Sequence, residues 1–277
     1  METKTQTGGK NKRVGKKTLG ISAGIVILVC AIMAYLFYTY ICGDPKNFVN
    51  EDPNNHPLPG NIFGLIHKAG VVVMAIQTIL LTALVLSVER FFALGKAKGK
   101  GNLINFVYDV KANLRKNDIT ASEALCAKQK GSVAAIVDAG LKKYREMSES
   151  NDLTKEAKIG EIKAEIEEAT ALELPAMQQN LPVIATISTL GTLLGLLGTV
   201  LGMIRAFSAM ATAGAPDSVA LSAGISEALI NTAFGIATGA MAIISYSYFT
   251  GKIDNMTYAI DEMGFALTQT YAETHDK

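Results

Sequence analysis

The chain has 277 residues, of which 49% are hydrophobic and none is tryptophan, and its formal net charge is +1. Three cysteines and three histidines are scattered without metal-ligand spacing, so neither a metal site nor a paired-cysteine motif is expected. The sequence also lacks a nucleophile–base constellation and a phosphate-binding loop. We therefore expect no enzyme, no cofactor and no nucleic-acid partner.

The apolar residues gather in four blocks, 19–41, 62–88, 181–211 and 219–249. Each block exceeds the roughly 20 residues that a helix needs to cross a bilayer. The first is about 23 residues long, which is more than the apolar core of a signal peptide, so it is expected to be retained. The sequence predicts an all-α integral membrane protein with four transmembrane helices, whose long third and fourth helices extend into a helical cytoplasmic domain.

Lysine and arginine predict the orientation of these helices. Six precede residue 19 and fifteen lie between Arg90 and Pro175, whereas 42–61 contains one and 211–218 contains none. Because cytoplasmic segments carry the excess of basic residues, both chain ends are expected in the cytoplasm. The expected parts are a basic N-terminus (1–18), an extra transmembrane helix (19–41), a periplasmic loop (42–61), a transmembrane helix (62–89), a helical cytoplasmic domain (90–180), a transmembrane hairpin (181–250) and a cytoplasmic C-terminal helix (251–277).

Between the second and third apolar blocks, apolar residues recur at three- and four-residue spacing, which predicts helices over 103–116, 121–129, 133–147 and 153–174. Asp118 and Thr120 supply a candidate N-cap for the second of these helices. Pro175 and Pro182 predict a kink or break where the last of them meets the membrane. The proline-rich segment 42–61 is expected to be a plain loop.

The third and fourth apolar blocks are rich in small residues. Such residues let two membrane helices approach closely. They recur in the third block as Gly191-x-x-x-Gly195 and Gly198-x-x-x-Gly202, and in the fourth as Gly224, Ala228, Gly235 and Gly239. The spacing predicts a tightly packed hairpin.

Glu227 is a single carboxylate inside the fourth apolar block. A charged group within a bilayer is costly, so its presence points to function. At 1.5 Å per residue, Glu227 lies about 12 Å and Thr232 about 19 Å below the outer end of their helix, while Thr199 lies about 18 Å below the end of its own. Asn231 is one turn from Glu227 and shares its face. These polar groups are expected in one band of the hairpin.

Two roles for this band remain open from the residues alone. The carboxyl group could take up and release protons or, with threonine hydroxyls, coordinate a small cation; alternatively, Glu227 is a neutral, hydrogen-bonded packing residue. Arg205 is a second ionisable residue in the third block. It is expected to extend towards the membrane surface or to pair with an acidic group of a partner.

Two segments, Leu-Leu-Gly-Leu-Leu-Gly-Thr-Val-Leu-Gly-Met-Ile (193–204) and Gly-Ile-Ser-Glu-Ala-Leu-Ile-Asn-Thr-Ala-Phe-Gly (224–235), resemble the ExbB/TolQ/MotA family of ion-channel subunits. Ser87-Val88-Glu89-Arg90 is a weaker match to the end of the family's first helix. The chain is most similar to the ExbB branch. By this resemblance, Thr199, Glu227 and Thr232 are ion-path residues, with Asn231 and Arg205 secondary.

The resemblance also implies partners and a place in the cell. Such proteins form a homo-pentameric ring in the bacterial inner membrane, around the helices of an ExbD-type single-span protein whose aspartate carries the ion. The proton motive force then drives a TonB-type protein, which energises import across the outer membrane. The extra helix at 19–41 departs from the common plan and is expected on the outside of the ring.

Two alternatives follow from the same residues. One is a TolQ subunit of the Tol-Pal envelope system, and the other is a membrane scaffold without ion flux. Asn231 is polar where a small apolar residue is more typical of the family, so Na⁺ remains open beside H⁺.

Overall fold

The computed structural model describes residues 22–150, 152–212 and 218–275, and in these ranges the chain forms helices and no strands. The expected basic N-terminus and the turn between the third and fourth blocks lie wholly or largely outside the described residues. Four helical segments are long and apolar enough to cross a membrane. They lie within Ala23–Cys42, Val71–Arg115, Lys155–Ser208 and Leu221–Thr274. The prediction of an all-α membrane protein with four spanning helices is confirmed.

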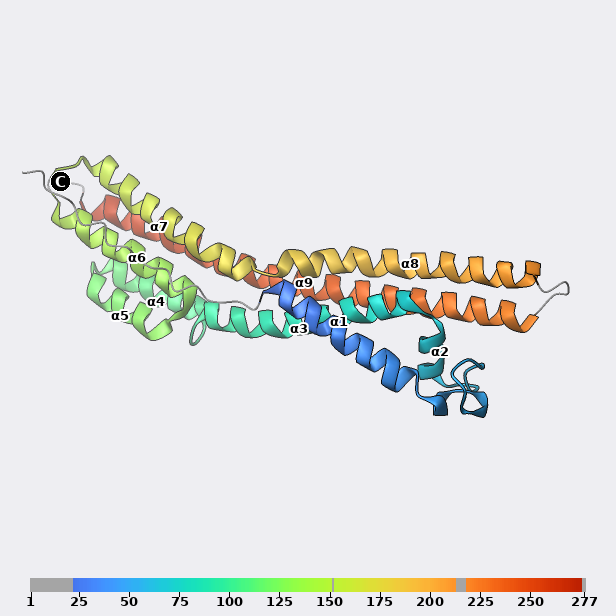
Figure 1. Ribbon diagram of the computed structural model, residues 1–277. Helices are drawn as coiled ribbons and strands as arrows, with labels where there is room; N and C mark the ends of the chain where they lie inside the picture. The colour runs from blue at the N-terminus through green and yellow to red at the C-terminus, as the bar shows by residue number, and fades with distance from the viewer. Residues whose placement is uncertain (1–21, 151, 213–217, 276–277) are drawn as a thin grey trace, which may run out of the picture.

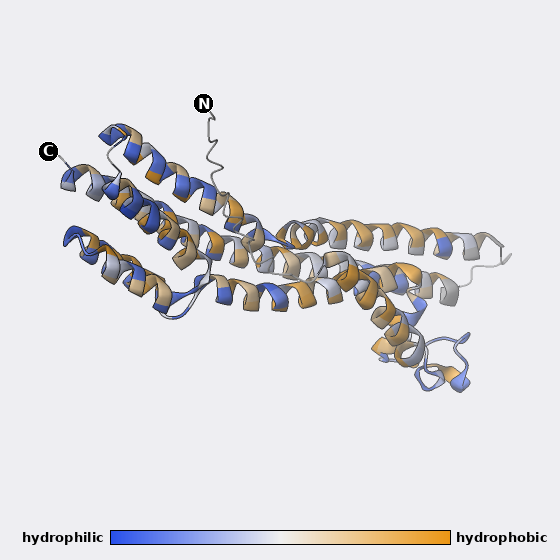
Figure 2. Ribbon diagram, turned by 60° about the vertical axis from the view of Figure 1, so that its left-hand side comes forward, coloured by the Kyte–Doolittle hydropathy of each residue, from blue (hydrophilic) through white to orange (hydrophobic). Residues whose placement is uncertain are grey.

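Two long helices set the shape of this elongated molecule (Figure 1). Helix α8 (Leu181–Thr212) lies antiparallel to α9 (Ser218–Thr274), which has 57 residues. At 1.5 Å per residue α9 is about 85 Å long, far more than a bilayer requires. The helix expected at 251–277 is the second half of α9, which runs without a break to Thr274, as expected for a long fourth helix that extends beyond the membrane. Figure 2 shows apolar residues dominating α8 and the first half of α9.

The second apolar block is divided into two helices instead of the single one expected at 62–89. Helix α2 (Ile62–Lys68) ends at Ala69, and α3 (Val71–Lys98) begins after Gly70. Gly70 has a φ of +81°, a left-handed conformation that favours glycine because it has no Cβ atom. The expectation of one continuous helix was wrong here.

Helix α1 (Ala23–Leu36) continues as a short π-helix, Phe37–Cys42. Val26 and Cys30 of α1 pack in one buried cluster with residues of α3, α8 and α9. At the other end, the Tyr38 hydroxyl donates a hydrogen bond to the His67 carbonyl at 2.7 Å, and the two rings stack. Helix α1 is therefore fixed to the other membrane helices at one end and to α2 at the other.

Beyond the membrane-spanning part lies a bundle that we call the helical module. It contains α4 (Leu103–Arg115), α5 (Ile119–Gln129), α6 (Gly131–Glu149), α7 (Lys155–Gln178) and the second half of α9. The Asp118 carboxylate accepts a hydrogen bond from the Ala121 amide at 2.8 Å and caps α5. The four helices expected from periodicity are thus present with small shifts at their ends.

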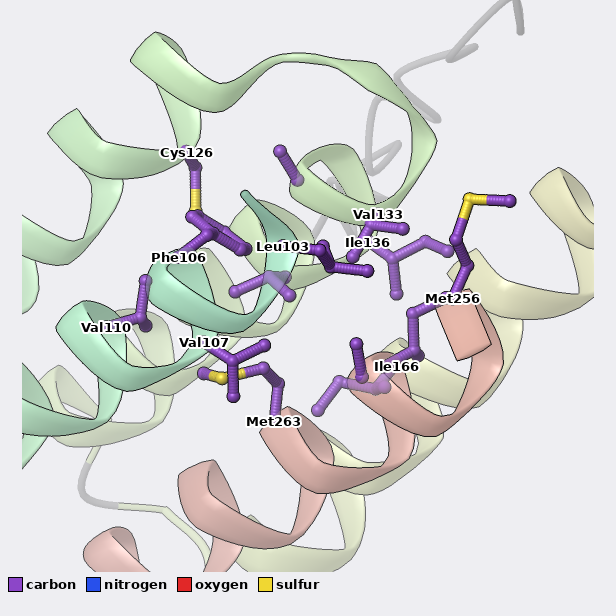
Figure 3. Close-up of a cluster of buried hydrophobic side chains, with 14 of the residues drawn as sticks. Leu103, Phe106, Val107, Val110, Cys126, Val133, Ile136, Ile166, Met256 and Met263 are labelled. Atoms are coloured by element: carbon purple, nitrogen blue, oxygen red, sulfur yellow. The ribbon is translucent and has the colours of Figure 1, made fainter. Parts of the chain in front are cut away.

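Apolar side chains from all five elements meet in one core, of which Figure 3 shows a part. Phe106 and Val110 of α4, Ile136 of α6 and Met263 of α9 are each at most 5% exposed. Cys126 of α5 is buried in the same core, and burial, followed by the nearby Asp138 and Glu123 carboxylates, raises the pKa of its thiol to about 12. A thiol with this pKa is almost entirely protonated at neutral pH, so Cys126 serves as a small core residue.

The junction between α7 and α8 is the point where the helical module meets the spanning hairpin. Helix α7 contains Pro175 and ends at Gln178, and Asn180 has a φ of +64°. Arg90 of α3, which is 1% exposed, donates hydrogen bonds to the carbonyls of Ala176 and Met177 at 3.2 and 3.3 Å. Proline therefore lies within the last turn of α7, and the break comes three residues after it.

Candidate functional site

Helices α8 and α9 approach so closely that their glycines meet backbone to backbone. A Cβ atom added to Gly195 would lie 3.1 Å from the Gly235 Cα, and one added to Gly202 would lie 3.0 Å from the Gly224 carbonyl oxygen. A Cβ atom added to Gly191 would lie 2.9 Å from the Gly239 amide nitrogen. The small-residue motifs of the sequence therefore face one another along the hairpin, as their spacing predicts.

Thr199 and Thr232 face each other across this hairpin. Their hydroxyl groups are hydrogen-bonded, and each lies 3.2 Å from the Gly195 carbonyl oxygen as well. Thr232 also lies within hydrogen-bond distance, 3.2 Å, of the Ala228 carbonyl. The structure thus brings together two residues that are 33 positions apart in the sequence, in a pair that we call the threonine pair.

Glu227 and Arg205 form an ion pair between the same two helices. The Arg205 Nη1 atom lies 3.3 Å from the Glu227 Oε2 atom, and the side chains are 53% and 17% exposed respectively. From the sequence, Arg205 was expected either to extend towards the membrane surface or to pair with an acidic group of another protein. In the structure its partner is instead a carboxylate of the same chain.

This ion pair lies beside the break between α2 and α3. A Cβ atom added to Gly70 would lie 3.3 Å from the Arg205 Nη1 atom. A side chain at position 70 would therefore crowd the guanidinium group, in addition to the strain of the left-handed backbone. The break allows the backbone of a third helix to approach the hairpin.

Asn231 is 2% exposed and connects the hairpin to the same break. Its amide group donates a hydrogen bond to the Ala69 carbonyl at 3.2 Å, which satisfies a backbone acceptor at the end of α2. Gly198 leaves the space for this side chain, because an added Cβ atom there would collide with Asn231. The Asn231 Oδ1 atom is buried and has no hydrogen-bond partner among the described residues. Asn231 therefore has a packing role that its position in the sequence did not indicate.

Sequence reasoning missed Ala69 and Gly70 as part of this region, which we call the polar cluster: Ala69, Gly70, Arg205, Glu227 and Asn231. An isolated glycine within an apolar run was the available signal. No group of three or more histidine, cysteine, aspartate or glutamate residues in the described ranges could hold a metal ion. The chemistry of the site therefore comes from one carboxylate, one guanidinium group, hydroxyls and backbone carbonyls in an apolar hairpin.

The profile of the MotA/TolQ/ExbB proton channel family matches residues 123–262, just over half of the chain. The chain belongs to this family. The matched region contains all of α6 to α8 and the first part of α9, so it includes both the threonine pair and the Arg205–Glu227 ion pair. Together with the four apolar helical segments, membership of a channel family identifies a multi-pass membrane protein.

Relatives within the MotA/TolQ/ExbB family carry two kinds of name. A biopolymer transport protein named ExbB-like 3 from Synechocystis is 29% identical over 119 residues, which cover 42% of this chain and 57% of that protein. The Tol-Pal system protein TolQ from Pseudomonas aeruginosa is 25% identical over 194 residues, which cover 69% of this chain and 84% of that protein. An ExbB homologue from Methanothermobacter thermautotrophicus is 26% identical over 197 residues, which cover 71% of this chain and 65% of that protein.

Replacing Gly235 with alanine is expected to destabilise this family member. A Cβ atom at position 235 would lie 2.6 Å from both the Gly191 carbonyl oxygen and the Gly195 Cα, and backbone atoms cannot rotate away. Forcing extra volume into a packed contact costs about 1–3 kcal/mol, which thermal unfolding of the purified protein in detergent would detect as a lower Tm.

Gly251 provides the matched control on the same helix. No atom lies within 4 Å of a Cβ atom added there, so Gly251→Ala is expected to leave stability unchanged or raise it by up to about 1 kcal/mol through helix propensity. Equal Tm values for the two variants would show that the close approach of α8 and α9 is not required.

Proposed function

We propose that this chain is an ExbB-type subunit of a proton-driven motor in the bacterial inner membrane, with both of its ends in the cytoplasm. Together with an ExbD-type single-span protein, it would use the proton motive force to drive a TonB-type protein and so energise import across the outer membrane. The observation that carries this proposal is the group formed by the threonine pair and Glu227. These residues lie on the two helices of one apolar hairpin, inside the region that matches the proton channel family.

Thr199, Glu227 and Thr232 are the proposed ion-path residues, and Arg205 and Asn231 have secondary roles. The Arg205 guanidinium group would act on the path through its 3.3 Å contact with Glu227. An ion moving past Glu227 changes the charge that Arg205 faces, so the pair couples ion movement to the position of α8 relative to α9. The Asn231 Oδ1 atom adds an acceptor oxygen near the path, which keeps Na⁺ open as an alternative to H⁺.

A homo-oligomeric ring is proposed because the hairpin presents apolar surface that the single chain leaves uncovered, and the resemblance to the ExbB branch implies five copies. Along α8 this surface contains Leu193, Leu196, Val200, Ile204 and Phe207, each about half exposed. On α9 it contains Leu229, Ile236 and Ile244. Neighbouring copies, the helix of the ExbD-type partner and membrane lipids would share these surfaces. The part of helix α1 nearer its N-terminus packs against α3, α8 and α9 through Val26 and Cys30. Most of its other apolar side chains are exposed, which suits a place outside the ring.

A TolQ subunit of the Tol-Pal system is the second candidate. It is supported by the TolQ proteins of Pseudomonas aeruginosa and Haemophilus influenzae, whose alignments cover 84% and 86% of their own lengths. A membrane scaffold without ion flux is the third candidate. The two transport functions share the same ion path and differ in the partner that the ring encloses.

The deciding experiment is complementation in two bacterial strains that lack ExbB or TolQ, in each case with the chain's own single-span partner co-expressed. The proposed function predicts restored growth on an iron chelate that needs TonB-dependent import, and no rescue of detergent sensitivity in the TolQ-deficient strain. Rescue of detergent resistance alone would favour the TolQ function. Rescue in neither strain, with the protein present in the membrane and bound to its partner, would contradict both transport functions.

A further inference from the structure

We propose that a groove between α3, α4 and α9 binds the headgroup of an anionic phospholipid from the membrane leaflet next to the helical module. The groove has a volume of about 810 Å³ and lies where the spanning helices enter that module. It is separate from the polar cluster and the threonine pair, so this inference is independent of the ion path.

Positive charge dominates the walls of this groove, which we call the basic groove. Lys98, Lys111, Arg115 and Lys252 line it, and Glu262 is its one carboxylate. Lys111 pairs with Glu262 at 2.8 Å. Among the described residues, no carboxylate lies within 4.0 Å of Lys98, Arg115 or Lys252. Three cations therefore remain for an anionic ligand, and phosphate is a group that lysine and arginine bind well.

The position of Lys252 places one end of the basic groove at the membrane surface. Lys252 follows the last apolar stretch of α9, and its Nζ atom lies 4.9 Å from the ring centre of Tyr248 and 5.9 Å from that of Phe91. Aromatic rings and lysines together are typical of the level at which lipid headgroups lie. A phosphate group at this depth can approach Lys252 without leaving the membrane surface.

The apolar side of the groove continues directly into the lipid-facing surface of α3. Leu84, Val88 and Phe91 are 42%, 57% and 56% exposed, and their spacing of three and four residues places them on one face of the helix. Gly95 and Lys98, which line the groove, extend the same face. Acyl chains can therefore lie along α3 while their headgroup occupies the basic groove, an arrangement that fits a phospholipid better than a free phosphate ion.

A second copy of the chain is the competing occupant. Helix α7 has exposed carboxylates at Glu161, Glu167 and Glu168, and such a surface could also face a basic groove. It offers no counterpart to the exposed apolar face that runs from the groove into the membrane. Because the exposed apolar face of α3 continues directly into the groove with its three free cations, a phospholipid fits better than a second copy of the chain.

The test compares two triple variants with the same loss of charge. Lys98→Gln/Arg115→Gln/Lys252→Gln removes the free cations of the groove, and Lys96→Gln/Lys116→Gln/Lys128→Gln removes three exposed cations outside it. Native mass spectrometry of the delipidated full-length protein, titrated with phosphatidylglycerol or phosphatidylcholine, would measure lipid binding. The wild type and the control variant are expected to prefer phosphatidylglycerol, and the groove variant to lose at least about tenfold of that preference.

The proposal would be overturned if the groove variant preferred phosphatidylglycerol as strongly as the wild type does. It would also be overturned if the control variant lost as much of this preference as the groove variant. An altered oligomeric state of the groove variant with unchanged lipid preference would identify the groove as a contact between copies, which also overturns it. The single variant Lys252→Gln, at an exposed position, is expected to show a smaller loss in the same direction. It provides the measurement if the triple variant does not fold.

Discussion

Glu227→Ala is expected to reduce energised transport to the level of cells that lack the protein, while the protein still inserts and assembles. In the proposed mechanism Glu227 supplies the carboxylate of the ion path within the α8–α9 hairpin. The substitution leaves Arg205 without its partner at 3.3 Å, and its long side chain can still extend towards the membrane surface. Uptake of an iron chelate and the amount of assembled complex, measured in the same cells, would separate the two effects.

Two further variants of Glu227 distinguish its charge from its contacts. Glu227→Gln retains a side-chain oxygen that can accept a hydrogen bond from Arg205 but removes the group that binds and releases a proton, so it is expected to abolish transport as well. Glu227→Asp retains the carboxyl group on a shorter side chain and is expected to keep partial transport. Glu168→Ala, at an exposed position of α7, is the control and should transport normally. Full transport by Glu227→Ala would support the non-conducting scaffold.

The hairpin illustrates what could be predicted from the sequence. The close approach of α8 and α9 depends on small residues in pairs four positions apart that recur on one helix face, and such a pattern is local enough to read directly from the chain. The depth of Thr199 and Thr232 follows from helix geometry in the same way. Their direct hydrogen bond agrees with the expectation of one polar band.

The break between α2 and α3 at Gly70 is a feature that could not be predicted from the sequence. One carbonyl at this break, that of Ala69, accepts a hydrogen bond from Asn231, which is 162 positions away along the chain. An apolar run that contains isolated glycines, here Gly64 and Gly70, is compatible with either a straight or a broken helix, and contacts with distant residues contribute to the choice. The pairing of Arg205 with Glu227 could not be predicted either, because it depends on the rotation of α8 relative to α9. Long-range contacts of this kind have no periodic signal in the sequence.

Arg90→Met is expected to lower the free energy of unfolding by about 3–5 kcal/mol, the usual cost of removing one partner of a buried ion pair. The Arg90 side chain donates hydrogen bonds to both oxygens of Glu89 and to the carbonyls of Ala176 and Met177. Methionine fills much of the same volume but leaves these carbonyls without the Arg90 donor. The Glu89 carboxylate loses its cation and keeps the hydrogen bond from the Asn180 side-chain amide at 3.3 Å. The Tm of the purified variant would measure the loss.

Arg145→Met is the matched control. Arg145 also pairs with a carboxylate, Glu123, at 2.7 Å, but its side chain is 45% exposed, so its loss should cost at most about 1 kcal/mol. The double variant Glu89→Leu/Arg90→Met removes both buried charges and should recover part of the stability that Arg90→Met loses. If Arg90→Met costs no more than the control, the break between α7 and α8 must be held by the local chain. If it costs the expected amount, α3 holds the junction between the spanning hairpin and the helical module.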